Sequence, residues 1–103
     1  MIIYNVTCSI ETDIINDWLE WMEKEHVPEV MNTGLFIEAQ INRVISDDKS
    51  GLVTYAIQYL CREMKDLHMY QSNFASSLQK KHLDRYGSKV IAFRTLLEVI
   101  NKF

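Results

Sequence analysis

Hydrophobic and polar residues alternate along four stretches of the chain, and this two-residue period predicts β-strands. The predicted strands are residues 2–10, 35–45, 52–60 and 89–100. In the first of them, apolar side chains take the even-numbered positions, while Asn5, Thr7 and Ser9 face the other way. The segment SDDKSG separates the second and third strands and predicts a turn, so these two strands should form a hairpin.

A helical period begins at Ile14. Its apolar arc consists of Ile14, Ile15, Trp18, Leu19, Trp21, Met22 and Val30. His26 projects into the same arc, together with Glu25 and Glu29. A helix with only a structural role would keep carboxylates away from its buried side. The segment is therefore a candidate for a functional site or an oligomer contact.

The same helix should be interrupted near its end. Pro28 lacks the backbone N–H that would reach the carbonyl of Lys24, and it disfavours helical geometry at Val27. We therefore expect a break near Val27, followed by one short turn that ends at Gly34.

A second helix is predicted to begin at Glu63 and to end at Gly87, because glycine suits the end of a helix. Its inner stripe consists of Met64, Leu67, Gln71, Phe74, Ala75, Leu78 and His82. No internal repeat, linker or low-complexity tract interrupts the chain.

The order strand–helix–strand–strand–helix–strand predicts an α+β fold of the ferredoxin-like βαββαβ type. In this fold, a four-stranded antiparallel sheet carries two helices on one face. The chain has 103 residues, which is the size of one domain, so we expect a single ferredoxin-like domain over residues 1–103.

The other face of the sheet has no covering helix in this topology, and its composition is unusual. It mixes neutral polar side chains with aliphatic ones, whereas a solvated face would carry more lysine and glutamate. Such a surface suits contact with another protein surface, and two stacked sheets would form a homodimer with two-fold symmetry. The residues predicted to contribute are Asn5, Thr7, Gln40, Asn42, Thr54, Gln58 and Arg94. Arg94 could hold a carboxylate there, but an ion pair with Glu98 or Glu38 across the dimer contact is the stronger expectation.

Charge and hydropathy argue against two classes of partner. The chain has 14 acidic and 11 basic residues without a basic stripe, so nucleic-acid binding has little electrostatic support. No uncharged stretch approaches the roughly 20 residues that span a bilayer, and no leader segment is evident, so we expect no membrane partner and a cytoplasmic location. Cys8 and Cys61 are expected to be reduced and buried.

The helices should run in opposite directions, so His26, His68 and Cys61 are predicted at one end of the molecule, and Trp18 and His82 at the other. The first three have ligand types that suit zinc or iron, but their spacing matches no known metal motif. We therefore expect no metal.

Four segments resemble a known family: MIIYNVT at the start, WLEWMEKEHVPEVMNTGLF in the first helix and turn, YAIQY in the third strand, and RYGSKVIAFRTLLEVI at the end. Over nearly its whole length, the chain resembles small bacterial proteins with a domain of unknown function in the dimeric α/β-barrel superfamily. This resemblance implies a ferredoxin-like fold and a homodimer, and it implies no activity.

The wider superfamily also implies a ligand pocket between the helices and the sheet. Its lining would consist of Tyr4, Val6, Trp18, Met22, His26, Tyr55, Tyr59, His68, Gln71 and Phe74. His26 is the best candidate for a catalytic acid–base group, because burial and neighbouring carboxylates tune the pKa of a histidine.

Two functions therefore remain open, and with them the question of whether the protein is an enzyme. The first is a homodimeric domain without a catalytic signature or cofactor, which binds a small molecule or a protein partner or serves as a structural unit. The alternative is a cofactor-independent monooxygenase or a haem-related enzyme, since both occur in the superfamily. A pocket filled by the protein's own side chains would exclude the alternative, and a partly polar cavity beside His26 would favour it.

Overall fold

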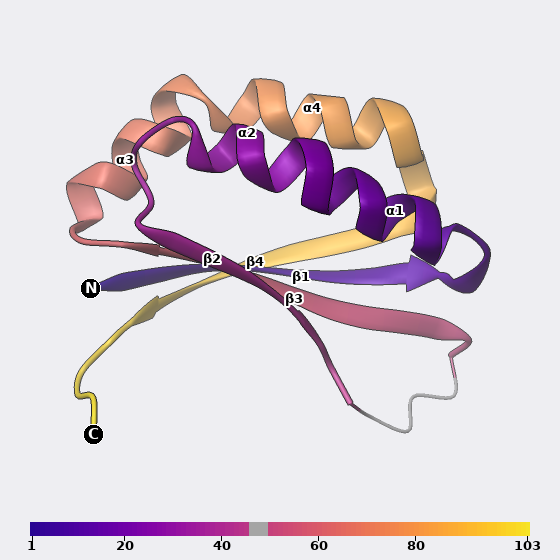
Figure 1. Ribbon diagram of the computed structural model, residues 1–103, viewed down its shortest axis with the longest axis horizontal. Coiled ribbons are helices and arrows are strands. Elements are labelled where there is room, and N and C mark those ends of the chain that lie inside the picture. The colour runs from indigo at the N-terminus through magenta and orange to yellow at the C-terminus, as the bar shows by residue number, and fades with distance from the viewer. Residues whose placement is uncertain (46–49) are drawn as a thin grey trace.

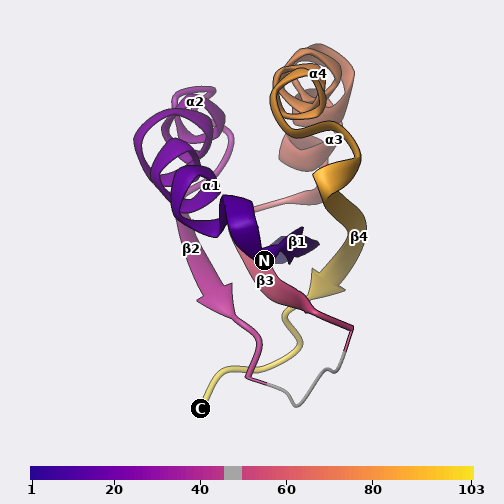
Figure 2. The same cartoon turned by 90° about the vertical axis from the view of Figure 1, so that its right-hand side faces the viewer.

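The computed structural model describes residues 1–45 and 50–103, and a four-stranded antiparallel sheet forms its base. The strands are β1 (Ile2–Glu11), β2 (Glu38–Arg43), β3 (Leu52–Cys61) and β4 (Val90–Glu98). Their order across the sheet is β2-β3-β1-β4, as the ferredoxin-like topology requires. The helices all lie on one side of the sheet (Figure 1), where they form two neighbouring rows (Figure 2). Most of the predicted SDDKSG turn falls on residues 46–49, outside the described residues.

The first helical segment continues through the predicted break. It consists of η1 (Thr12–Ile14), α1 (Ile15–Trp21), the π-helical turn η2 (Met22–His26) and α2 (Val27–Met31). Val27 keeps helical dihedral angles of −61° and −43°, and its N–H bonds to the Met22 carbonyl five residues back. The prediction of a break near Val27 is therefore wrong. The wider π turn shifts the hydrogen-bond pattern, so the missing N–H of Pro28 is accommodated inside a continuous helix.

The second helical segment, predicted as one helix, is divided at Phe74. α3 (Met64–Asn73) and α4 (Ala75–Tyr86) meet there, because Phe74 has a non-helical φ of −128°. The residues that this segment buries are Leu67, Tyr70, Ala75, Leu78 and Tyr86. Met64, Gln71 and Phe74 were predicted on the inner stripe but are exposed, because α3 turns Leu67 and Tyr70 toward the core instead. The turn η3 (Gly87–Lys89) leads into β4.

Strand pairing assigns each side chain to one face of the sheet. Tyr4 in β1 pairs with Tyr59 of β3 and with Leu96 of β4, and these three positions lie on the helix-covered face. Arg94 pairs with Val6, so it lies on the helix-covered face as well. The sequence predicts Arg94 on the bare face, and the structure corrects this.

The reason for the correction is the register of β4. Val90 is buried opposite Ile10, and the alternation of side chains then places Arg94 on the helix side. Thr95 is the residue opposite Asn5 on the bare face, and Glu98, opposite Ile2, is also on the helix side. The other predicted members of the bare face do lie there: Asn5, Thr7, Gln40, Asn42, Thr54 and Gln58.

The core fills the space between the helices and the sheet. Its largest fully buried side chains are Trp18, Ile10, Ile57, Leu67, Val30 and Cys61. Burial of each large apolar side chain stabilises a fold by roughly 1.5–3 kcal/mol, so this layer can hold the helices in place within one copy of the chain. Among the described helices, none is long and apolar enough to cross a membrane.

Candidate functional site

A recess of about 50 Å³ lies between the helices and the sheet. Its polar lining comes from three elements: His26 from η2, Gln79 and His82 from α4, and Arg94 from β4. The remaining lining residues are Tyr4, Val6, Cys8, Met22, Ile57, Tyr59 and Ala92. The site therefore combines an apolar floor with a few polar groups, which is the usual composition of a small-molecule site.

The two histidines of the recess lie close to each other and to both tryptophans. The ring centres of His26 and His82 are 6.0 Å apart. Nε2 of His82 accepts a hydrogen bond of 2.9 Å from the indole Nε1 of Trp18, so the neutral His82 ring carries its proton on Nδ1. The ring of Trp21 stacks on His26 at a centroid distance of 5.0 Å. The orientation of both imidazoles is thus set by the indoles of the first helix.

This arrangement differs from the prediction that His26 lies at one end of the molecule and that His82 and Trp18 lie at the other. Because the helix is continuous through Val27, His26 lies five residues before the end of the first helical segment at Met31. Both Trp18 and His26 of this segment face the later part of α4, where His82 is located, so the predicted grouping of Trp18 with His82 is correct and the separation of His26 from them is wrong.

Burial keeps the two histidines and the Cys8 thiol of the recess neutral. It is the main cause that lowers the pKa of His26 to about 4; the neighbouring His82 adds to the effect, and Glu29 opposes it. Burial, followed by the charge of Arg94, also lowers the pKa of His82. For the Cys8 thiol, burial raises the pKa to about 11, although Arg94 partly offsets this. At neutral pH the recess contains two neutral imidazoles and a protonated thiol, which is a poor nucleophile.

Arg94 is the cationic residue of the recess. Its Nε donates a hydrogen bond of 3.0 Å to the Tyr4 hydroxyl. In the described part of the chain, no carboxylate forms an ion pair with Arg94, so its two terminal amino groups remain available. The edge strand β4 holds this guanidinium at the mouth of the recess, where the residue is partly open to solvent.

The predicted pocket residues separate into three groups. Tyr4, Val6, Met22, His26 and Tyr59 line the recess. Trp18 and Tyr55 are buried beside it and pack against each other at 5.3 Å. His68, Gln71 and Phe74 are exposed on α3 or at its end and do not line the recess.

Sequence reasoning missed six residues of the recess: Cys8, Ile57, Gln79, His82, Ala92 and Arg94. His82 was on the predicted inner stripe of the second helix, so a continuous first helix would have brought it to His26. Arg94 could have been found only from the register of β4.

The described residues hold no cluster of three or more histidine, cysteine or acidic side chains that could bind a metal ion. Cys8 pairs with Tyr55 and Cys61 pairs with Ile2 along β1 and β3, and both thiols are free and buried.

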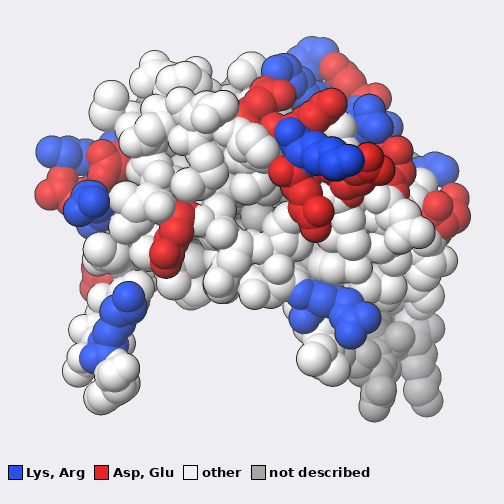
Figure 3. Space-filling model, in the orientation of Figure 1, with Lys and Arg blue, Asp and Glu red and all other residues white. Residues whose placement is uncertain are grey.

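The bare face of the sheet carries very little charge. In Figure 3, most of the acidic and basic side chains in view gather around the helices. Glu11 and Glu38 are the only ionisable residues among the described strand positions on the bare face. β4 contributes three exposed apolar side chains to this face: Ile91, Phe93 and Leu97.

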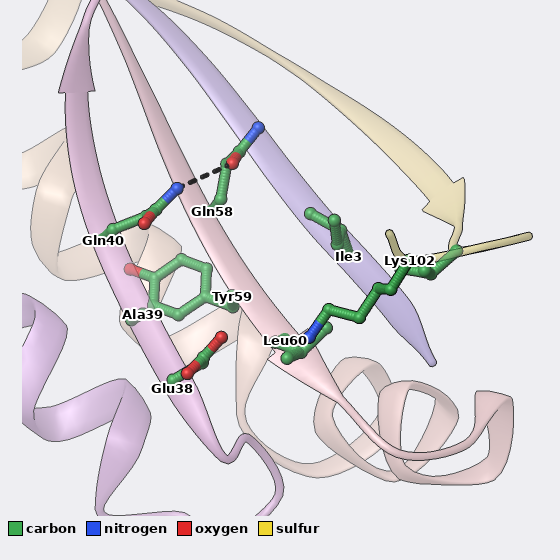
Figure 4. Close-up of a pocket in the computed structure, with 9 residues that line it drawn as sticks. Ile3, Glu38, Ala39, Gln40, Gln58, Tyr59, Leu60 and Lys102 are labelled. Atoms are coloured by element: carbon green, nitrogen blue, oxygen red, sulfur yellow. Dashed lines mark hydrogen bonds between the residues drawn. The ribbon is translucent and has the colours of Figure 1, made fainter.

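A hollow of about 220 Å³ lies on this face, between the strands and the C-terminal residues. Figure 4 shows Gln40 and Gln58 at one side of it, joined by a hydrogen bond of 3.2 Å between their side-chain amides. Lys102 extends over the strands toward Leu60 from the opposite side. The surface is therefore hollowed and largely neutral.

Asn5 lies in the middle of the bare face and is 9% exposed. Its side-chain nitrogen donates to the Thr7 hydroxyl at 3.0 Å, but its buried Oδ1 has no hydrogen-bond partner among the described residues. A buried carbonyl without a donor is costly, by about 1–3 kcal/mol, and calls for an explanation.

The fold and these two surfaces define a small ferredoxin-like α+β protein with a helix-covered recess and an open sheet face. The sequence profile of one family, described as a domain of unknown function (DUF4286), matches residues 1–100. The chain therefore belongs to this family. None of the curated proteins matches its sequence.

Solved structures share the fold at low sequence identity. A dimeric ferredoxin-like protein from an uncultured marine organism has a TM-score of 0.72 at 11% identity, covering 99% of this chain and 97% of that one. HapK from Hahella chejuensis has a TM-score of 0.71 at 5% identity, covering 100% and 96%. An ethyl tert-butyl ether (EthD) family protein from Bacillus halodurans has a TM-score of 0.66 at 10% identity, covering 97% and 100%. These similarities show the ferredoxin-like fold alone.

Proposed function

We propose that the protein is a homodimeric binding module without a catalytic constellation, in which two copies meet through their bare sheet faces and each copy keeps a recess for a small molecule. The observation that carries this proposal is the bare face, which is hollowed, has few charges and holds in its middle a buried amide oxygen without a hydrogen-bond partner among the described residues.

The energetics of the bare face favour a second copy. Neutral amides and hydroxyls lose less free energy than charges when water is removed, and they can be satisfied by the same groups of a partner across a two-fold axis. The exposed Ile91, Phe93 and Leu97 gain from burial at roughly 25 cal/mol per Å². A donor from the partner would also satisfy Oδ1 of Asn5.

The size of the face is adequate for a dimer. Four strands of about nine residues present roughly 600 Å² per copy, given the usual strand spacing and rise. Residues 99–103 lie on the same side of the sheet (Figures 1 and 2) and add Ile100 and Phe103, both highly exposed. Specific dimers bury about 800 Å² per partner, so the two contributions together approach a stable interface. One of the structurally similar proteins is described as dimeric, which supports the proposal.

The proposal is tested by sedimentation of the purified protein over a wide range of concentrations, together with native mass spectrometry. We expect a dimer at micromolar concentration. A single protomer at the highest attainable concentration would contradict the proposal. A cytoplasmic location and the absence of nucleic-acid binding belong to the same proposal.

One observation favours the alternative of a monooxygenase-like or haem-related enzyme: a partly polar recess does touch His26. Its volume of about 50 Å³ and its protonated Cys8 thiol argue for binding over catalysis. The test is a panel of haem, quinones and metal ions read by tryptophan fluorescence, since Trp18 and Trp21 lie beside the recess histidines. Quenching by a quinone or by haem would support the alternative, and an unchanged spectrum would count against it.

A further inference from the structure

Arg94 differs from the other cations around α4 in having no acidic partner in the part of the chain that the structure describes. Lys80 pairs with Asp84 at 2.6 Å, and Lys81 pairs with Glu29 at 2.8 Å. Arg94 bonds only to the neutral hydroxyl of Tyr4 among the described residues. The bond at Nε fixes the plane of the guanidinium and leaves its two terminal amino groups free for a bidentate contact.

An open groove of about 460 Å³ continues from the recess along the space between α4 and β4. The two share the lining residues Gln79, His82, Ala92 and Arg94. The groove also has apolar walls, which are formed by Leu83, Val90 and Ala92. A cation thus stands at the junction of a small polar recess and a larger, partly apolar groove.

We propose that this junction binds a small organic carboxylate, with the carboxylate on the terminal amino groups of Arg94 and the apolar body in the groove between α4 and β4. This inference rests on the proposed binding function of the recess and does not depend on dimerisation. A face-to-face dimer leaves the junction open, because Arg94 lies on the helix-covered side of the sheet.

The charge of the site selects a monoanion. Among the described residues that line the junction, Arg94 is the single cation without an acidic partner, since Lys80 is already neutralised by Asp84. A dianionic phosphate would need further cations, whereas one guanidinium matches one carboxylate in charge and in geometry. None of the described residues that line the recess or the groove is acidic, and Glu29, whose charge reaches His26, is paired with Lys81.

The size of the site decides how the ligand lies. A cavity that encloses benzene measures about 150 Å³, so the recess is too small for a ring but has room for a small substituent or for water. The ring or chain of the ligand therefore lies in the groove. His26, Gln79 and His82 line the recess and can hydrogen-bond a hydroxyl or carbonyl substituent that enters it.

The test is an NMR titration of the full chain, labelled with ¹⁵N, with three probes: benzoate, benzamide and inorganic phosphate. We expect benzoate to shift the signals of Gln79, Ala92 and Arg94. Benzamide has the same shape without the charge and should bind about tenfold more weakly, because a charged pair is roughly twice as strong as a neutral one. Phosphate should bind more weakly than benzoate.

Three variants test whether the NMR signal shifts caused by benzoate depend on the guanidinium of Arg94. Arg94→Gln should weaken benzoate about tenfold or more, and Arg94→Lys should have an intermediate effect, because lysine keeps the charge but loses the bidentate geometry. Arg43→Gln is the matched control, since Arg43 is an exposed arginine on the opposite edge strand, β2. It should leave the affinity unchanged.

The outcomes separate this inference from the proposed function. Equal binding of benzamide and benzoate at the same residues would overturn the choice of a carboxylate and still support a binding recess. An equal loss of affinity for benzoate in the Arg43 and Arg94 variants would also overturn the inference. Tighter binding of phosphate than of benzoate would do the same. Sedimentation of the same samples reports on the dimer independently.

Discussion

The two faces of the sheet satisfy their polar groups in different ways. On the helix-covered face, polar atoms are paired across elements, as between Trp18 and His82 or between Arg94 and Tyr4. On the bare face, they pair sideways within the sheet, as between Ser9 and Thr54 at 3.1 Å. The first face is completed by its own chain. The second has exposed apolar side chains and an amide oxygen that no described residue hydrogen-bonds, so we expect another surface to cover it.

The distribution of charge follows the same division. The ion pairs that link the two helical rows lie on the outer, solvent-facing side, for example Lys81 with Glu29 and Arg85 with Asp17. The bare face carries mainly amide and hydroxyl groups in place of charged groups. A surface that is to be desolvated must avoid charges, because unpaired charges cost several kcal/mol each when buried.

The largest effect is expected from a charge placed on the bare face. Phe93→Glu should raise the dimer dissociation constant by about two orders of magnitude or more, because it buries an unpaired carboxylate. Leu83→Glu is the matched control, since Leu83 is 63% exposed on α4 and Phe93 is 60% exposed on β4. The control should remain dimeric in sedimentation. A similar dissociation constant for both variants would remove the distinction between the two faces.

The next effect concerns pH and tests the helix-covered face. The pKa of His26 falls from 6.5 to about 4 on folding, so the unfolded chain binds more protons between these values. The free energy of unfolding should therefore decrease as the pH falls from about 6.5 to about 4, by about 2–3 kcal/mol, and the contribution should then level off. Urea unfolding at a fixed protein concentration measures this dependence.

The assignment to His26 has its own control. His26→Gln should flatten the pH dependence in this range, whereas His68→Gln removes an exposed histidine of α3 and should leave the dependence unchanged. If the free energy of unfolding of the His26 variant still depends on pH in this range, another titrating group causes the dependence. His82 is the first to examine, because burial lowers its pKa too.

The smallest effect should come from the charges on the outer side of the helices. A double-mutant cycle of Glu29→Gln and Lys81→Gln should give a coupling energy below about 1 kcal/mol, since both side chains are largely exposed to solvent. Urea unfolding of the four proteins measures it. A coupling of several kcal/mol would show that the helix pair depends on surface charge more than on its apolar core.

Much of the fold could be predicted from local pattern. The alternation of residues 2–10 placed β1 to within one residue, and the neutral amides of β2 and β3 lie on the bare face where the pattern placed them. Local patterns succeed here because a strand has a fixed two-residue period and one face must be buried. The same kind of reasoning correctly predicted His26 and Met22 in the recess, since both lie on the inner arc of the first helix.

The errors arose where a local rule met the rest of the structure. Pro28 usually ends a helix, but the π turn accommodates it, so the helix continues past His26 to Met31. Phe74 interrupted the second helix without any glycine or proline to signal it. Arg94 was assigned to the wrong face because β4 contains bulky apolar residues on both sides, so its register could not be read from alternation.

The sequence by itself determined the order of the strands and helices, the helix-covered face of β1 and β3, and the neutral character of the bare face, because each depends on periodicity within one segment. Only the tertiary structure decided that His26 meets His82, that Trp18 holds the second imidazole, and that Arg94 stands unpaired over the recess. These contacts join residues from 56 to 90 positions apart, for example Tyr4 and Arg94. Such distant pairs depend on strand register and helix continuity, which are settled only when all the elements pack together.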